Sequence, residues 1–362
     1  MIYLDANATT PLDPAVMAAM MPALREVFAN PSSVHKPGQD ARALVDRARE
    51  QCGEALDCDP REIVFTSGGT EADALAVRGL GRRKVVTTAV EHPALLGACA
   101  GLERAGAAVI RVPVDRAGRL DLDALDAALP GADLCSAMAA NNETGIVFPL
   151  ARIGELCRKH RVPFHTDAVQ AVGKMPVRIR ELPVDLVSCS AHKIGGPKGA
   201  GLLWLRRGIQ LAPVQVGGHQ ERGRRAGTEN VAGIVGLGEA LARATARLTT
   251  EVPRLSALRD RLETAARQIP GSRVAGDGAE RVCNTLNVAF DGCDGETLLV
   301  ALDVAGVAVS TAPRAARDRW SPLPCCWRWD TQRRWPAVRS ASRSGEERRP
   351  PRSRRSAGCF RT

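Results

Sequence analysis

Short apolar runs that alternate with amphipathic helical segments constrain the fold of this chain most. The runs are apolar almost throughout, without strict alternation, as expected of strands that are covered on both faces. Between them, Ala41, Val45, Ala48 and Cys52 recur at helical spacing. This βαβ rhythm predicts an α/β fold with a mostly parallel central sheet. The runs are KVVTTAV, AAVIRVPV, LCSAMAA, VPFHTD, DLVSCSA and GAGLLWL.

The pattern changes near Thr245, and this change predicts two domains. The first, over residues 1–245, is the large ligand-binding domain, with residues 1–15 forming an N-terminal arm near the smaller domain. In residues 246–311, Leu255, Leu258 and Leu262 mark a long helix. The strand-like CNTLNVAF and the helical ETLLVALDVAG follow it. We therefore predict a smaller α+β domain that breaks off after Thr311.

Residues 312–362 differ in composition from the rest of the chain. They hold 14 Arg and four acidic residues, so the whole net charge of +10 comes from this segment. One interpretation is a disordered basic arm, and another is a tail that binds nucleic acid. A third interpretation, a shifted reading frame, depends on the family resemblance given below. Four of the five tryptophans also lie here: Trp320, Trp327, Trp329 and Trp335.

Several classes of protein are disfavoured. No apolar run is long enough to span a membrane, and Asp5 interrupts the stretch where a signal peptide would need a basic and then an apolar region. We therefore predict a cytoplasmic protein. The 11 cysteines include no CxxC pair and no Cys/His cluster at zinc spacing, so we expect no metal site. The glycine-rich turns match neither a Walker motif nor GxGxxG, which disfavours nucleotide binding.

Polar side chains follow several of the predicted strands. Ligands of open α/β sheets bind beyond the carboxyl ends of the strands. Taken singly, each of these residues could be a helix cap or a buried hydrogen-bonding group, but together they predict one cleft. They are His92, Asn142, Asp167, Gln170, His192 and Lys193.

Lys193 stands out among the six lysines, because it alone directly follows an apolar strand and precedes a glycine-rich loop. Pyridoxal phosphate needs a Schiff-base lysine, an acid beside its pyridinium nitrogen and a phosphate-binding cup. Asp167 can supply the acid. The Ser67–Glu71 turn, which opens a helix, can supply backbone N–H groups for a phosphate. Pyridoxal phosphate is therefore the predicted cofactor.

The chain closely resembles the cysteine desulfurases of the NifS/IscS type, which are fold-type I pyridoxal-phosphate enzymes. This resemblance implies the PLP-dependent transferase fold and conversion of L-cysteine to L-alanine, with transfer of sulfane sulfur to an enzyme cysteine. It also implies a homodimer that delivers sulfur to an acceptor or an iron–sulfur scaffold protein, for cluster or thio-cofactor assembly. The matching segments are YLDANATTP, NPSSVH, SGGTEAD, VEHPA, NNETG, HTDAVQAVGK, SCSAHKIGGPKGAG and RRAGTEN.

The resemblance also implies roles for single residues. Lys193 would be the Schiff-base lysine and the base at the substrate Cα. Asp167 would hold the pyridinium proton, and His92 would stack on the ring and assist proton transfer. Gln170 and Asn142 would bind the ring oxygen, with Asn142 also near the substrate carboxylate. The implied phosphate-binding residues are Gly69, Thr70, Ser190, His192 and Thr228, the last contributed by a partner subunit.

The family's nucleophilic cysteine is missing from its expected place. It stands in a loop reading roughly STGSACSSG, whereas Thr311 is followed here by APRAA. Cys325 and Cys326 lie further along a dissimilar sequence. With suitable synonymous codons, back-translation of the tail read one nucleotide earlier gives TGSACSSG and later RFSLGR. A cysteine then stands in place of Ala315 and the family's carboxylate-binding arginine in place of Ala341. We therefore predict a one-base frameshift after Thr311.

Two other functions remain open at this point. A selenocysteine lyase or another pyridoxal-phosphate β-lyase would use the same fold and the same lysine. A catalytically inactive scaffold of this fold, with a basic tail that binds nucleic acid, belongs to a different class of protein. Arginine and tryptophan suit such a tail, but shifted GC-rich codons also yield arginine, proline, tryptophan and cysteine.

Overall fold

A computed structural model describes residues 1–311 of the 362-residue chain. The basic tail and its cysteines, including Cys325 and Cys326, lie outside the described residues, as do the predictions made for them. None of the described helices is long and apolar enough to cross a lipid bilayer.

A seven-stranded sheet forms the centre of the described chain. Its strand order is β2-β8-β7-β6-β5-β3-β4. Strands β3 to β7 pair in parallel, and β8 alone runs antiparallel to its two neighbours. The predicted mostly parallel sheet is therefore confirmed. The strands are β2 (Ile63–Thr66), β3 (Lys84–Thr88), β4 (Ala108–Val112), β5 (Leu134–Ser136), β6 (Phe164–Asp167), β7 (Leu186–Ser190) and β8 (Gly201–Leu205).

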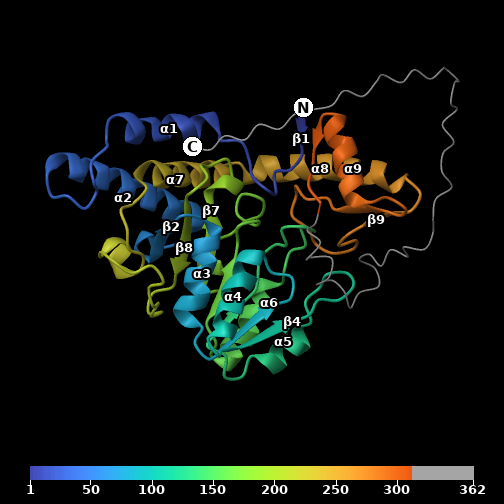
Figure 1. Cartoon of the computed structure of the whole chain (residues 1–362), viewed down its shortest axis with the longest axis horizontal. Coiled ribbons are helices and arrows are strands. Elements are labelled where there is room, and N and C mark those ends of the chain that lie inside the picture. Colours follow the sequence, from blue (N-terminus) through green and yellow to red (C-terminus); the bar gives the residue numbers. More distant parts are fainter. Residues whose placement is uncertain (312–362) are drawn as a thin grey trace, which may run out of the picture. The chain divides into compact units, whose positions relative to one another are not determined.

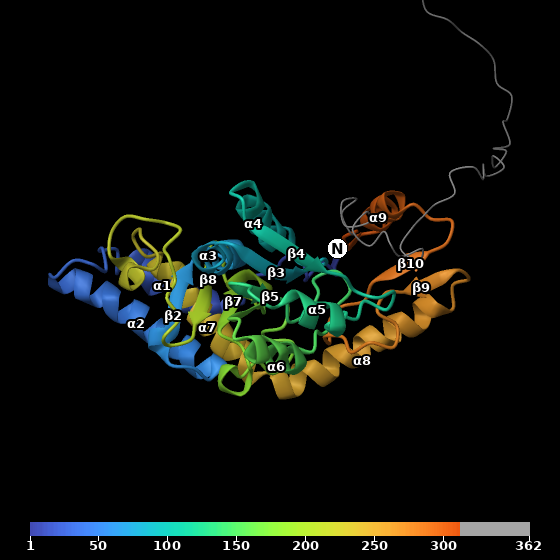
Figure 2. The same cartoon turned by 90° about the horizontal axis from the view of Figure 1, so that it is seen from below.

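Helices cover both faces of this sheet, with α3 and α4 on one side and α2, α6 and α7 on the other (Figures 1 and 2). Each face of the sheet has its own hydrophobic core, and neighbouring residues of a strand point into different cores. Val85 packs with α3 and α4 on one face, whereas Val86 packs in the core on the opposite face. This explains why the strands read as continuous apolar runs. The helices are α1 (Pro14–Arg25), α2 (Lys36–Leu56), α3 (Gly69–Leu80), α4 (Pro93–Arg104), α5 (Leu122–Ala128), α6 (Leu150–His160), α7 (Val231–Ala246), α8 (Leu248–Arg267) and α9 (Gly295–Val304).

Two further pairs of strands accompany α8 and α9. The first strand, β1 (Ile2–Tyr3), pairs in parallel with β11 (Val307–Ala308), while β9 (Ser272–Val274) pairs antiparallel with β10 (Val288–Phe290). The N-terminus accordingly lies beside α9 (Figure 1). The long helix predicted after residue 245 is α8. Neither α8 nor α9 contains a buried residue among those described.

The predicted strand CNTLNVAF is shorter in the structure, because only its last three residues form β10. Residues of its first part form hydrogen bonds outside the sheet. The side chains of Asn284 and Thr285 contact Asn7, with distances of 3.0 Å to Asn7 Oδ1 and 2.9 Å to Asn7 Nδ2. These bonds hold the segment against the N-terminal arm instead of in a sheet.

Candidate active site

The helix α3 begins directly after β2, at a glycine turn without a side-chain cap. Gly68, at the N-cap, has a φ of 155° and offers no side-chain cap to the helix. A Cβ atom on Gly69 would lie 2.8 Å from Val169 Cγ2 and 3.7 Å from Ser190 Cβ, so only glycine fits against these neighbours. The first N–H groups of the 12-residue helix therefore remain available to a phosphate next to Ser190.

Asp167 ends β6 and lies two residues before Val169, the residue that packs on Gly69. It is only 7 % exposed, and its Oδ1 accepts the N–H of Val169 at 2.9 Å. Burial raises the pKa of Asp167 to about 6, against the lowering effects of this N–H group and of the positive charge on Lys193. A cationic group placed beside Asp167 would hold its carboxylate ionised.

Lys193 follows β7 at the end of a short 3₁₀ helix, Ala191–Lys193. Its Nζ donates to the backbone oxygen of Asn7 and, at 2.9 Å, to that of Ala8. Burial lowers the pKa of Lys193, although the negative charges of Asp167 and Asp5 oppose this shift. The lowered pKa leaves more of the amine unprotonated, and an unprotonated amine is what a nucleophilic or basic lysine requires.

Asn7 joins the N-terminal arm to this cluster. Its backbone oxygen accepts from Lys193 Nζ and, at 3.0 Å, from Gln170 Nε2. Its side-chain amide donates to the backbone oxygen of Asn142 at 3.2 Å. We did not single out Asn7 from the sequence, although it lies within the matching segment YLDANATTP.

His92 caps the N-terminus of α4. Its Nδ1 accepts the N–H of Ala94 at 3.2 Å, so the ring can carry its proton on Nε2. Burial, together with the charge on Lys193, lowers the pKa of His92. A neutral imidazole is therefore present at neutral pH, close enough to Lys193 for their charges to interact.

Four buried polar residues, Asp73, His165, Ser136 and Ser188, lie behind Asp167, on the side covered by α3. Asp73, on α3, has its Oδ1 3.8 Å from Nε2 of His165. His165, two residues before Asp167 on β6, bonds the hydroxyl groups of Ser136 at 2.8 Å and Ser188 at 2.9 Å. Burial lowers the pKa of His165 to about 3 and raises that of Asp73 well above its ordinary value. Burial therefore favours the uncharged form of both groups.

Glu91 is a further buried acid beside this cluster. Its Oε1 accepts from Thr88 Oγ1 at 2.7 Å and from the N–H of Met138 at 2.9 Å, while its Oε2 has no hydrogen-bond partner among the described residues. Burial raises the pKa of Glu91 to about 8, with a contribution from the charge of Asp167 and against the two hydrogen bonds. Glu91 was also absent from our prediction.

Glu91→Gln is expected to stabilise the protein increasingly as the pH rises from about 4.5 to 8. The folded state binds the Glu91 proton more tightly than the unfolded state, in which the pKa is about 4.3. Wild-type stability therefore falls with pH across this window, by on the order of 5 kcal/mol for this group. Urea unfolding at pH 5 and pH 8 measures the difference. Glu155→Gln, at an exposed glutamate, serves as the control, and an equal effect at both pH values would contradict the prediction.

Other residues that the resemblance implicated lie at the edge of the cluster or outside it. Nδ1 of His192 is 3.2 Å from Thr9 Oγ1, and burial, with nearby lysine charges, lowers the pKa of His192 to about 4. Thr70 is exposed in the first turn of α3. Thr228 is exposed before α7, and no hydrogen bond or ion pair among residues 1–311 joins it to the cluster.

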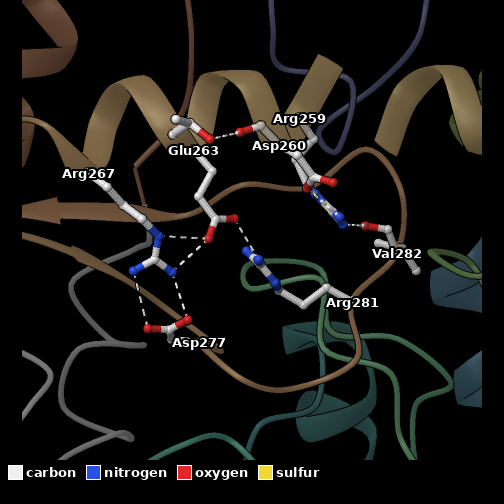
Figure 3. A network of polar contacts seen from close by, with 8 residues as sticks. Arg259, Asp260, Glu263, Arg267, Asp277, Arg281 and Val282 are labelled. Atoms are coloured by element: carbon white, nitrogen blue, oxygen red, sulfur yellow. Dashed lines mark hydrogen bonds and ion pairs between the residues drawn. The ribbon is translucent and has the colours of Figure 1, made fainter. Parts of the chain in front are cut away.

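An ionic network on α8 holds the segment that contacts Asn7 (Figure 3). Glu263 binds Arg267 at 2.7 Å and Arg281 at 2.6 Å. The N–H of Val282 then donates to the backbone oxygen of Gly145 at 2.8 Å, in the turn that carries the predicted site asparagine. The network therefore connects α8 to the segment that carries Asn284 and, through Val282, to the turn that carries Asn142.

These residues together fit pyridoxal phosphate. The cofactor needs an amine for its aldehyde, a carboxylate for its ring nitrogen and donors for its phosphate. Lys193 provides a half-buried amine, and Asp167 a buried carboxylate whose charge interacts with that amine. The turn at Gly68 and Gly69 provides N–H groups without a side-chain cap. Gly69 packs against Val169, which lies two residues after Asp167.

Comparison with known proteins identifies similar chains. The aminotransferase class-V family matches residues 2–331. A cysteine desulfurase of Trichormus azollae is 46 % identical over 328 residues, which cover 89 % of this chain and 82 % of that protein. The solved structure of a NifS-like protein is 36 % identical, with a TM-score of 0.83, and the match covers 88 % of this chain and 89 % of that one. A structure titled SspA in complex with cysteine is 30 % identical, with a TM-score of 0.76 and coverage of 87 % and 90 %.

Proposed function

The chain belongs to the class V aminotransferase family, as a pyridoxal-phosphate-dependent cysteine desulfurase, and from this membership we propose how its residues divide the work. The observation that carries the proposal is the convergence of Lys193 and Asp167, from two adjacent strands, beside the uncapped start of α3. Because the relatives are named cysteine desulfurases, a selenocysteine lyase and an inactive nucleic-acid-binding scaffold are not favoured.

Lys193 is the proposed anchor of the cofactor and the base at Cα. Bound pyridoxal phosphate supplies an electron sink for the charge that develops when the Cα proton leaves. Burial lowers the pKa of Lys193, so that its amine can accept this proton near neutral pH. Neutral His92 lies on the same side and can pass a proton through Nε2. Asp167 retains its negative charge and stabilises a protonated ring nitrogen.

The other site residues bind and orient. Gln170 and Asn142, which both contact Asn7, are the proposed ligands of the ring oxygen, with Asn142 also close to the substrate carboxylate. The proposed phosphate ligands surround the start of α3 and the end of β7, where Ser190 is buried. They are Gly69, Thr70, Ser190 and His192, with Thr228 from a second copy of the chain.

A homodimer is the proposed assembly. Thr228 is exposed, so it is available to contact the phosphate bound by a second copy, as the family resemblance implies. Exposed apolar side chains on and after α1 support an interface on this part of the chain. They are Met17, Leu24, Phe28 and Val34. Light scattering during gel filtration measures the assembly.

L-cysteine is the substrate supported by the relatives' names, and a sulfur acceptor or iron–sulfur scaffold protein is the proposed partner in a cytoplasmic setting. In the sulfur step, a protein thiolate attacks the substrate sulfur, the Cβ–S bond breaks and a persulfide S–S bond forms. Among the described cysteines all but Cys293 are buried. Burial raises the thiol pKa of Cys52 and Cys189, so both remain protonated.

We infer that the nucleophile belongs to the shifted reading frame that follows Thr311. The chain as written is expected to bind pyridoxal phosphate but to form little alanine and persulfide from L-cysteine. A chain with the restored frame, which has a cysteine in place of Ala315, is expected to turn over at least 100-fold faster, because a covalent nucleophile is regained. Alanine and sulfide release measure turnover.

The control for this experiment is the restored chain with that cysteine changed to serine, which should fall back to the rate of the chain as written. Efficient turnover by the chain as written would contradict the frameshift and would point to Cys325 or Cys326. An intact reading frame on resequencing the gene around Thr311 would also overturn it.

A further inference from the structure

Lys174 is a buried lysine that the proposed chemistry does not use. The chain after β6 makes a helical turn, in which the N–H of Ala171 donates to the oxygen of Ala168 at 2.9 Å and that of Lys174 to the oxygen of Ala171 at 3.0 Å. Residues four positions apart share one face of such a turn. Lys174 accordingly reaches back to Gln170, and its Nζ donates to Gln170 Oε1. Lys174 is 7 % exposed and Gln170 5 %.

The chemistry of the lysine determines which way the amide of Gln170 faces. A protonated Nζ carries only donors, so the end of the amide that faces it must be the oxygen. The NH₂ end of Gln170 must then face the opposite way. There it donates to the backbone oxygen of Asn7 at 3.0 Å, the same oxygen that accepts from Lys193. Lys174 thus directs a hydrogen-bond donor of Gln170 toward the site lysine.

Keeping Lys174 inside the protein is costly. Among the residues that the structure describes, no carboxylate lies within ion-pair distance of Lys174, and a buried charge without such a partner is unfavourable. Burial lowers the pKa of Lys174 to about 7, as does the nearby charge of Lys193, while Cys283 acts in the opposite direction. Packing alone would be served better by methionine, which fills a similar volume without a charge.

We propose that Lys174 is a positioning residue, which fixes the amide of Gln170 so that its NH₂ group faces the ring oxygen of the cofactor. This inference rests on the proposed function, in which Gln170 binds that oxygen. An anionic or phenolic oxygen accepts hydrogen bonds, and the amide NH₂ is a donor. Without Lys174, the bond from Nε2 to the backbone oxygen of Asn7 is the remaining contact that orients the amide. A turned amide, which presents its own oxygen to the ring oxygen, then becomes more frequent.

A double-mutant cycle tests the proposal through binding of pyridoxal phosphate itself. Lys174→Met is expected to raise the dissociation constant of pyridoxal phosphate about tenfold, the effect of one lost or misdirected hydrogen bond. It should also shift the pH midpoint of the visible absorbance of the lysine-bound cofactor. In a Gln170→Ala background, Lys174→Met should change neither quantity further, because the residue through which it acts is gone.

Two more variants keep the test decisive. Lys174→Arg retains a donor-only cation and should restore most of the affinity, and it replaces the methionine variant if that variant does not fold. Lys198→Met, at an exposed lysine of the loop after Lys193, should leave affinity and midpoint unchanged. An equal loss in both backgrounds, or no loss in either, would overturn the positioning role. Failure of the wild-type chain to bind pyridoxal phosphate would overturn the proposed function as well.

Discussion

Replacing Lys193 by alanine is expected to slow exchange of the Cα proton of L-alanine with solvent deuterium by about 10³- to 10⁴-fold. The variant loses both the amine that holds the cofactor and the base that removes the proton. In the wild-type chain, burial lowers the pKa of Lys193, and an exposed lysine lacks that environment. Proton NMR of the pyridoxal-phosphate-loaded protein in D₂O measures the exchange, which forms no persulfide and so does not need the missing cysteine.

Lys198→Ala is the matched control, because Lys198 is an exposed lysine in the loop that follows Lys193. It should exchange the proton at the wild-type rate. Exchange at the wild-type rate in Lys193→Ala would show that another amine is the base, and the buried Lys174 would then be the group to replace.

Asp167→Asn is expected to slow the same exchange by about 10²- to 10³-fold, the range found when one electrostatic stabiliser of a transition state is removed. The amide occupies the same space but cannot hold a proton on the ring nitrogen. In the wild-type chain, burial raises the pKa of Asp167 to about 6 before a cofactor binds. Protonation below this pH removes the negative charge, so wild-type affinity for the cofactor should fall as the pH drops through 6.

The asparagine variant should lack this dependence of affinity on pH. Asp167→Glu, which keeps the charge, should retain part of the exchange rate, and Asp126→Asn, at a surface ion pair with Lys159, should change nothing. A wild-type rate in Asp167→Asn would contradict the assignment of Asp167 to the ring nitrogen. An unchanged pH dependence of cofactor affinity would contradict it independently.

The central sheet could be predicted because its strands are buried on both faces. A strand between two layers of helices is buried on both faces and so is apolar at most positions. Leu186 and Val187, which pack on opposite faces of the sheet, illustrate this. The positions of Asp167 and Lys193 at strand ends followed from the same reasoning. Parallel strands bring their carboxyl ends to one edge, so residues far apart in sequence meet there.

Asn7 could not be predicted from local patterns. Its bonds join it to Lys193 and Asn284, which lie 186 and 277 positions away in the sequence. No periodicity indicates such a contact, because it depends on how the N-terminal arm runs past the finished sheet. The matching segment YLDANATTP indicated that the N-terminal arm belongs to the family pattern, but it did not indicate that Asn7 contacts the site.

The buried groups Asp73, Glu91 and Lys174 escaped prediction for a different reason. Charged side chains are usually solvated, so each had an ordinary interpretation as a surface residue. Only the structure shows that α3 covers Asp73 against β6 and that the turn after β6 carries Lys174 inward. Burial of a charge depends on tertiary packing and leaves no local signature in sequence.

Helices α8 and α9 contain no buried residue among those described, and Val300, Val304 and Leu262 are exposed, with Val304 at 85 %. Uncovered apolar helix faces are recognised by chaperones and proteases. In a cell, the abundance of this chain should therefore be set by protein quality control as much as by its synthesis. A low yield that recovers when proteases are deleted would reveal this surface before any measurement of catalysis.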